Sequence, residues 1–214
     1  LSFLGDDDDA KVREQEALLH KRLRTFATGL TQVATIQVWS AEGRMLVGSH
    51  AFPADPKIDV RDREYFREQR IRQSDRYVSG MLTGRRSGAR FIDVSVRREL
   101  SDGTFAGLVS TTIRPAYFKN FYESLSVAER GLSVSLLRHD GQLLARWPEP
   151  PTEMRSIPST APMRRAMAGD LPSGTLDAES LIDGKRRLLA YRKLDSYAVY
   201  VVAGIQHRQF LADW

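Results

Sequence analysis

Arg63 precedes a pair of aromatic residues, Tyr65 and Phe66, by two and three positions. A guanidinium group offers a rigid fork of hydrogen-bond donors to a carboxylate, and neighbouring aromatic rings exclude water, which strengthens that contact. The three residues therefore have the chemistry to bind a small anion. The alternative is structural: Arg63 pairs with Asp59 or Asp62 on the surface, and the two rings belong to the core.

Nothing typical of an enzyme or a metal site accompanies these residues. The sequence has no cysteine, which excludes a thiol nucleophile, a cysteine-ligated zinc and a disulfide. Neither a Gly-x-Ser-x-Gly elbow, a P-loop nor a Gly-x-Gly-x-x-Gly motif occurs. The histidines lie far apart and lack the spacing of a metal-binding helix; they are His20, His50, His139 and His207. We therefore expect no catalytic residues, no metal and no cofactor.

The composition is that of an ordinary globular protein. Of 214 residues, 42% are hydrophobic and 28% are charged, which is enough apolar material for one large domain or two small ones. The formal net charge of +5 suits an anionic partner. The arginines are dispersed over the whole length, so we do not expect nucleic acid as a partner. No run of 18 apolar residues occurs, and from the start at Leu1 we expect a segment of a longer protein.

Hydrophobic periodicity predicts the elements that position these side chains. From about Asp8 to Val33, apolar residues recur every three or four positions, which predicts one long helix with an apolar stripe. The stripe consists of Leu19, Leu23, Phe26, Leu30 and Val33. The period then changes to two. The expected elements are a hairpin over 34–47, a short helix over 62–72, a strand at 77–79, a second hairpin over 91–113 and a helix opened by Pro115.

The second half of the chain repeats this plan. The expected elements are a hairpin over 132–147, a short helix over 162–168, strands at 181–182, 187–194 and 198–205, and a terminal helix over 206–214. The order hairpin, helix-bearing loop, antiparallel strands and helix therefore occurs twice. Two α+β units, each an antiparallel sheet with helices, are the simplest solution.

Several segments resemble, in the right order, the double-Cache (tandem PAS-like) sensor domains of bacterial transmembrane receptors. Residues 58–67, Ile-Asp-Val-Arg-Asp-Arg-Glu-Tyr-Phe-Arg, are similar to the family's D-V-S-D-R-x-Y-F segment. Residues 77–80 with the turn at 83–85, and residues 105–118, resemble its pocket strand and the strand that enters its inter-domain helix. Residues 136–146 resemble the opening hairpin of its second unit. The resemblance covers about Val33 to Trp214.

The resemblance implies an α+β fold in which a long N-terminal helix flanks two tandem PAS-like units, each a curved antiparallel sheet with helices. It implies an N-terminal helical segment over 1–33, a membrane-distal unit with the ligand pocket over 34–125 and a membrane-proximal unit over 126–205. Residues 206–214 would form a terminal helix that leads to a transmembrane segment, with Trp214 suited to the membrane interface. The family's position is periplasmic, as the extracytoplasmic domain of an inner-membrane protein with a cytoplasmic kinase or cyclase output.

The resemblance also implies which residues contact a ligand. Arg63, Tyr65 and Phe66 take the places of the family's arginine-aromatic group, and Tyr77 and Ser79 occupy a further pocket position. Alternating strand positions that could line the same pocket are Trp39, Ser95, Arg97 and Ser110, and Thr112 stands at a further pocket position. Trp39 is also a candidate core residue.

The expected ligand is a small carboxylate rather than an amino acid. Amino-acid-binding members tend to carry Tyr-x-Asp at the pocket strand and a further aspartate on the strand before the inter-domain helix. Ser79 and Thr112 stand at these places, so the carboxylates that would neutralise an ammonium group are missing while Arg63 remains.

We therefore expect a non-catalytic sensing module that binds a small anionic molecule, forms a homodimer in the full-length receptor and transmits a conformational change across the membrane. The alternative is a module with a vestigial pocket that mediates dimerisation or contact with a periplasmic partner. In that case the stripe from Leu19 to Val33 would be a seam between subunits.

Overall fold

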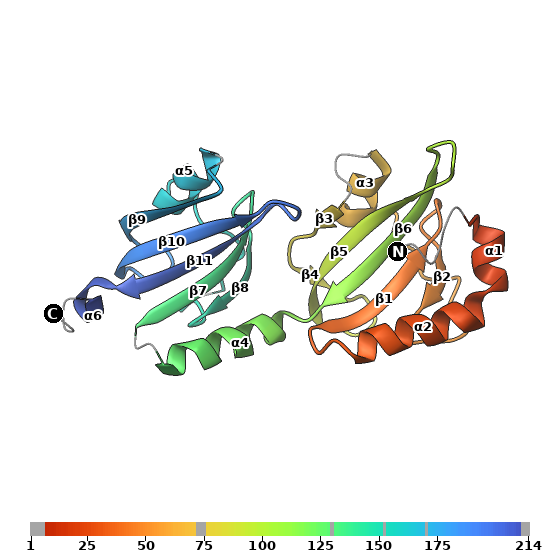
Figure 1. The fold of residues 1–214 in the computed structure, drawn as a ribbon, viewed down its shortest axis with the longest axis horizontal. Coiled ribbons are helices and arrows are strands. Elements are labelled where there is room, and N and C mark those ends of the chain that lie inside the picture. Colours follow the sequence, from red (N-terminus) through yellow and green to blue (C-terminus); the bar gives the residue numbers. More distant parts are fainter. Residues whose placement is uncertain (1–6, 72–75, 129–130, 152, 170, 211–214) are drawn as a thin grey trace. The chain divides into compact units, whose positions relative to one another are not determined.

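Two antiparallel sheets organise the chain, each in its own unit (Figure 1). The computed structural model describes residues 7–71, 76–128, 131–151, 153–169 and 171–210. The first unit consists of Leu1–Leu82 and Phe91–Arg114, and the second consists of Thr83–Arg90 and Pro115–Trp214.

The strands of the two sheets follow the same order. In the first sheet they are β1 (Val33–Trp39), β2 (Met45–Gly48), β3 (Arg76–Val78), β4 (Leu82–Thr83), β5 (Arg90–Glu99) and β6 (Phe105–Ile113), arranged β2-β1-β6-β5-β3 with β4 beside β5. In the second they are β7 (Leu132–Arg138), β8 (Leu143–Trp147), β9 (Ser173–Glu179), β10 (Arg186–Leu194) and β11 (Val199–Gln206), arranged β8-β7-β11-β10-β9. Each sheet thus begins with a hairpin and places its last strand at the centre, which confirms the predicted α+β repeat of two PAS-like units.

The N-terminal helical segment differs from the expected single helix. It consists of α1 (Asp9–Glu14), capped by the Asp8 carboxylate, and α2 (Glu16–Thr28), which ends at Gly29. Leu19 and Leu23 are buried, whereas Phe26 is 54% exposed and Leu30 44% exposed. The predicted continuation to Val33 is wrong because the chain leaves the helix at Gly29 in order to enter β1. The apolar spacing past that point is accidental.

Helices cover both faces of the first sheet. On one face, α1 and α2 bury Val12, Leu19 and Leu23 against Val38 and Val109. On the other face lies α3 (Glu64–Ile71), on the side of the sheet opposite α1 and α2 in Figure 1. Its aromatic residues join a second apolar cluster, which contains Trp39, Met45, Val60, Tyr65, Phe66 and Leu108. The predicted short helix over 62–72 is thereby confirmed to Ile71; Arg72 is outside the described residues.

The second unit repeats this arrangement. Helix α4 (Pro115–Ala128) packs against β7 and β8, and α5 (Pro162–Ala168) supplies Met163 and Met167 to a core with Leu137 and Tyr200. Helix α6 (His207–Phe210) begins the predicted terminal helix, whose residues 211–214 are outside the described part of the chain. The helix between hairpin and following strand therefore lies over a sheet face in both units.

One predicted strand is misplaced. Leu181 and Ile182 lie in a turn, and the edge strand of the second sheet is β9, which pairs with β10. The β9 sequence is mostly polar and exposed, with only Ala178 buried. Its strand conformation comes from backbone hydrogen bonds to β10, so periodicity alone does not reveal it.

Gly107 permits a close approach of β6 to β1. Its φ is +107°, and a Cβ atom there would lie 2.0 Å from the Trp39 carbonyl oxygen. We expect Gly107→Ala to destabilise the first unit by roughly 3 kcal/mol or more. The strain of a positive φ and the clash of the new Cβ atom with the Trp39 carbonyl would both contribute. Gly103 is the matched control: its φ is +82° with nothing near the added atom, so Gly103→Ala should cost only about 1–2 kcal/mol. Urea denaturation of both variants measures the difference, and equal losses would contradict the close-approach argument.

Candidate functional site

The strand register brings most of the predicted site residues to one face of the first sheet. Ser95 of β5 pairs with Ser110 of β6 and with Tyr77 of β3. Asp93 of β5 pairs with Thr112 of β6. Because alternate residues of a strand share a face, these five side chains lie on the side of the sheet that α3 covers. We define this group, together with Arg63 and Gln69, as the α3-face site.

The residues at the start of α3 divide between the site and the core. Tyr65 and Phe66 are buried, and Phe66 meets Phe105 edge to face with ring centroids 5.7 Å apart. Arg63 is half-buried directly before the helix, and its charge acts on the Asp93 carboxyl. Asp59, one of the partners considered for Arg63, forms ion pairs with Arg61 at 2.8 Å and Arg44 at 3.5 Å.

A chain of hydrogen bonds crosses the sheet beneath α3. The Trp39 indole N–H donates to the Ser110 hydroxyl oxygen at 2.9 Å, and Ser110 in turn is hydrogen bonded to the Asp93 carboxyl. The Ser79 hydroxyl accepts from the Asp93 backbone N–H at 2.9 Å and donates to the Gly80 carbonyl at 2.7 Å. The hydroxyl groups of Ser79 and Ser110 therefore fix the position of Asp93.

Asp93 is a candidate site residue that the sequence did not reveal. It is 1% exposed, and burial raises the pKa of its carboxyl well above the ordinary value, although the Ser110 hydrogen bond and the charge of Arg63 oppose that shift. Its Oδ1 atom has no hydrogen-bond partner. A buried, unpartnered carboxyl oxygen is costly in a native protein and calls for an explanation. A ligand that donates a hydrogen bond would supply the missing partner.

Gln69 and Arg97 hold α3 on the sheet. The Gln69 amide is fully buried and donates to the Ser95 carbonyl at 3.0 Å, while its Oε1 atom has no partner. The Arg97 Nη1 donates to the carbonyl oxygens of Gln69 at 2.5 Å and Arg70 at 3.1 Å, and its guanidinium lies 4.6 Å from the Phe105 ring centroid. A cation at the C-terminal end of a helix is favourable, so these contacts give Arg97 a positioning role.

Glu64 contacts the residues of and just after β3 at one end of the site. The Tyr77 hydroxyl donates to its carboxylate at 2.6 Å, and the Gly80 backbone N–H lies 3.4 Å from the other carboxylate oxygen. Thr112 is half-buried on the same face. The site thus presents a cationic donor in Arg63, an acceptor in Asp93 and hydroxyl groups between them. Glu64, Gln69 and Asp93 are all absent from the predicted set because their burial depends on how α3 packs.

Metal chemistry has no candidate in the described part of the chain. No group of three or more histidine, aspartate or glutamate side chains is placed to hold an ion there. His20 lies 2.7 Å from the Gly48 carbonyl oxygen and stacks near Phe52, and His207 pairs with Asp177 at 2.8 Å. Both rings bind neighbouring protein groups on separate units.

Comparison with known proteins identifies the family. The Cache domain model dCache_1 matches residues 3–214. The extracellular domain of a candidate histidine kinase, rpHK1S-Z16, is 30% identical with a TM-score of 0.77, and the match covers 96% of this chain and 86% of that chain. No curated protein matches the sequence.

Two more distant structures share the fold alone. The sensor domain of the V. cholerae histidine kinase DctB is 11% identical with a TM-score of 0.57, over 95% of this chain and 86% of that chain. The ligand-binding domain of the Pseudomonas fluorescens chemoreceptor CtaA, solved with L-alanine, is 13% identical with a TM-score of 0.58, over 95% of this chain and 99% of that chain.

Cache domains are non-catalytic modules that lie in the extracellular parts of membrane receptors. Within the residues that the structure describes, no helix has both the length and the apolar character needed to cross a bilayer. The family match over almost the whole sequence, the two PAS-like sheets and the likeness to histidine-kinase and chemoreceptor domains agree. The chain belongs to the Cache domain family, as an extracellular ligand-sensing domain of the double-Cache type.

Proposed function

We propose that the α3-face site of the first unit binds a small molecule with a carboxylate and an adjacent hydrogen-bond donor, either an amino or a hydroxyl group. The observation that carries this proposal is the buried, unpartnered Oδ1 of Asp93, a carboxyl on which the charge of Arg63 acts. Arg63 binds the carboxylate through its guanidinium, and the donor of the ligand pairs with Asp93. The aromatic rings of Tyr65 and Phe66 form the dry wall behind these contacts.

Asp93 widens the ligand class beyond a plain carboxylate. The preference for a ligand without an amine depended on Ser79 and Thr112, which stand where amino-acid-binding members carry aspartates. Asp93 lies opposite Thr112 on the neighbouring strand and supplies a carboxyl from there. An α-amino acid or an α-hydroxy acid therefore fits the site, and L-alanine in the chemoreceptor CtaA is a ligand of the first kind.

The other predicted site residues act at different distances from the ligand. In this proposal Tyr77 and Thr112 contact the ligand, whereas Trp39, Ser79, Ser95 and Arg97 position the groups that do. Trp39 and Ser79 orient Asp93 through hydrogen bonds, and Arg97 holds the C-terminal end of α3. Binding would tighten α3 on the sheet, because Arg63 precedes that helix and Asp93 lies under it.

The family supports a proposal for the receptor context. We place the domain in the periplasm, tethered to the inner membrane, with a cytoplasmic kinase or cyclase as the output and a homodimer as the working state. The ligand can shift the receptor between two states only by the difference of its affinities for them.

A second function is favoured by one observation. Three large apolar side chains of the N-terminal segment are exposed, at 49%, 54% and 44% of their surfaces; they are Leu18, Phe26 and Leu30. Exposed apolar surface of this kind suits a contact with another subunit or a periplasmic partner. The module would then serve dimerisation or partner binding, with a vestigial α3-face site.

Ligand binding can be measured by thermal shift against plain carboxylates, amino acids, hydroxy acids and amines. A ligand at one hundred times its dissociation constant should stabilise the protein by about 2.7 kcal/mol, which is several degrees in Tm. Arg63→Ala should abolish the shift for every carboxylate-bearing ligand. Asp93→Asn should abolish it for amino acids and weaken it for hydroxy acids, because only the charged carboxylate pairs with an ammonium group.

Arg67→Ala is the matched control, since Arg67 is exposed on the same helix and should leave all shifts unchanged. A thermal shift that remains in Arg63→Ala would show that the ligand binds outside the α3-face site. No shift from any class, with all variants equally stable, would favour the dimerisation or partner-binding function.

The buried carboxyl of Asp93 also predicts a pH dependence of stability. Burial raises the pKa of Asp93 in the folded protein. The protonated carboxyl therefore contributes favourably to the free energy of unfolding at low pH, and this contribution is lost as the pH rises through the folded pKa. As the pH rises from acid to neutral, the free energy of unfolding of Asp93→Asn should therefore increase relative to that of the original protein. Urea denaturation across this range measures the difference in free energy of unfolding.

Asp102 gives a control of opposite sign. Hydrogen bonds from Thr104 lower the pKa of this exposed turn carboxyl, so its contribution is present above the ordinary aspartate pKa and is lost on acidification. As the pH rises, the free energy of unfolding of Asp102→Asn should decrease relative to that of the original protein. The same trend in both variants would show that Asp93 is not the buried acid described here.

A further inference from the structure

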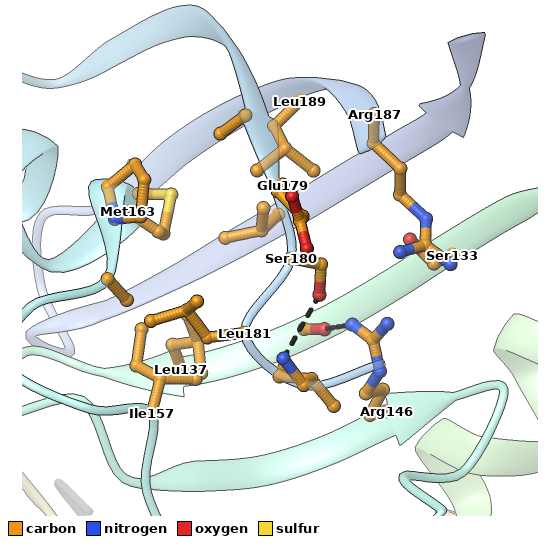
Figure 2. A pocket seen from close by; sticks show the side chains of 16 residues that line it. Ser133, Leu137, Arg146, Ile157, Met163, Glu179, Ser180, Leu181, Arg187 and Leu189 are labelled. Carbon is orange, nitrogen blue, oxygen red and sulfur yellow. Dashed lines mark hydrogen bonds between the residues drawn. The ribbon is translucent and has the colours of Figure 1, made fainter. Parts of the chain in front are cut away.

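A cavity of about 50 Å³ lies inside the second unit, away from the α3-face site (Figure 2). Its walls come from the five strands β7 to β11, from α5 and the segment before it, and from the turn between β9 and β10. The side chains that matter for its chemistry are Ser135, Leu137, Arg146, Met163, Arg187 and Leu189. We call it the second-unit cavity.

The second-unit cavity occupies the same topological place as the α3-face site. In the first sheet, Asp93 pairs with Thr112, which pairs with Thr35. In the second sheet, Leu189 pairs with Gly204, which pairs with Ser133. The strand orders match, and the first strand of each sheet has a register shift at the corresponding point, before Trp39 and before Leu137. Thr35 and Ser133 each lie four residues before that point, so Leu189 stands at the register position of Asp93. The cavity is thus a second version of the site, with an apolar residue where the first unit has its carboxyl.

Two buried arginines form one end of the cavity. Arg146 is 8% exposed and Arg187 is 1% exposed. Arg187 donates to both Asp183 carboxylate oxygens, at 2.6 and 2.7 Å, while Arg146 donates to the Ser135 hydroxyl at 2.7 Å and contacts Asp183 at 3.3 Å. Burial raises the pKa of Asp183, but the arginines outweigh that effect and hold it at about 2. Two guanidinium groups therefore share one ionised carboxylate, which leaves one buried positive charge in excess.

Each guanidinium also has a free donor. The Nε–H groups of Arg146 and Arg187 are buried and have no hydrogen-bond partner. An unsatisfied buried donor on a charged group is costly, and an anionic oxygen would satisfy it best. Glu179 also lines the cavity, but it is exposed to solvent, so water screens its charge far more than the charges of the arginines.

The other end of the cavity is apolar. In Figure 2, Met163, Leu137 and Ile157 lie across the pocket from Arg146 and Arg187. A water-sized group needs roughly 10–15 Å³ on the same scale, so the volume fits only a few such groups. The space suits a carboxylate with a short alkyl chain and excludes a drug-sized ligand.

We propose that the second-unit cavity is a separate binding site for a short-chain monocarboxylate such as propionate. The carboxylate lies at the Nε–H groups of Arg146 and Arg187 and neutralises the excess positive charge. The alkyl chain lies against Met163 and Leu137. An amino group on the ligand is unfavourable, because Leu189 replaces the acceptor that Asp93 supplies in the first unit.

Methyl groups of methionine report the two sites separately. Met163 lines the second-unit cavity, and Met45 lies in the core beneath α3. We would titrate the whole chain, labelled with ¹³C at the methionine methyl groups, with sodium propionate and record the two resonances by NMR. The Met163 resonance, assigned through Met163→Leu, should shift saturably. Propionamide and propylamine, which lack the negative charge, should not move it.

Two variants test the mechanism in different ways. Arg146→Gln should weaken propionate binding at Met163 by about tenfold or more, since a charged hydrogen bond is lost while Arg187 still neutralises Asp183. Ala178→Leu fills the cavity without altering charge and should abolish the shift. Arg63→Ala, the matched arginine change in the first unit, should leave it intact.

The results also separate this inference from the proposed function. A propionate shift at Met45 alone would overturn the second-unit site and leave the α3-face site supported. The absence of a saturable shift at Met163 would likewise overturn the second-unit site. So would a shift that propionamide reproduces, or one that persists unchanged in both Arg146→Gln and Ala178→Leu. A saturable shift at Met163 that Arg146→Gln weakens and Ala178→Leu abolishes, while Arg63→Ala leaves it intact, supports the second-unit site, whatever the first unit binds.

Discussion

The pairing of β5 with β6 sets Asp93 opposite Thr112 and Ser95 opposite Ser110, and the chemistry of the first unit depends on that register. Successive side chains of a strand point to opposite faces, so a slip of β6 by one residue would turn Ser110 and Thr112 towards α2 and bring Val109 under α3. The apolar contacts of Val38 and Val109 with α2 on the other face resist such a slip. The apolar packing on the α2 face of the sheet thus fixes the positions of the polar side chains on the α3 face.

Polar groups beneath a helix are unfavourable unless they are hydrogen bonded. Most of those under α3 meet this condition: the Trp39 indole, the Ser110 and Ser79 hydroxyls and the Gln69 amide nitrogen all have partners. The exceptions are single oxygens of Asp93 and Gln69. A sheet face that stability alone had shaped would carry apolar residues here, as Leu189 does in the second unit. Local departures of this kind are expected where a protein binds something.

The sequence predicted much of the fold and less of the site. Alternating strands, Gly-containing turns and the repeated order of elements predicted the main strands of the first sheet and all but the edge strand of the second, because those signals are local. The end of α2 and strand β9 were missed, since the first depends on the turn into β1 and the second on pairing with β10. Arg63 and the aromatic residues entered the candidate site through a motif, and their role stays a prediction. Asp93 was missed because an aspartate in an alternating strand resembles a solvent-facing residue, and its burial becomes evident only in the folded structure.

The two units show how one topology supports two chemistries. The same register position carries Asp93 in the first sheet and Leu189 in the second, and cationic groups enter from different elements, from the turn before α3 and from β8 and β10. In our proposal the first site sets the Arg63 guanidinium and the Asp93 carboxyl at opposite ends of a ligand, so it would discriminate by both ends of the molecule. The second site has positive charge at one end and apolar side chains at the other, so it would select by charge and chain length. Ligands of the two sites would differ in class, and any coupling between them would act equally in both directions, because each can change the other's affinity only through a shared change of state.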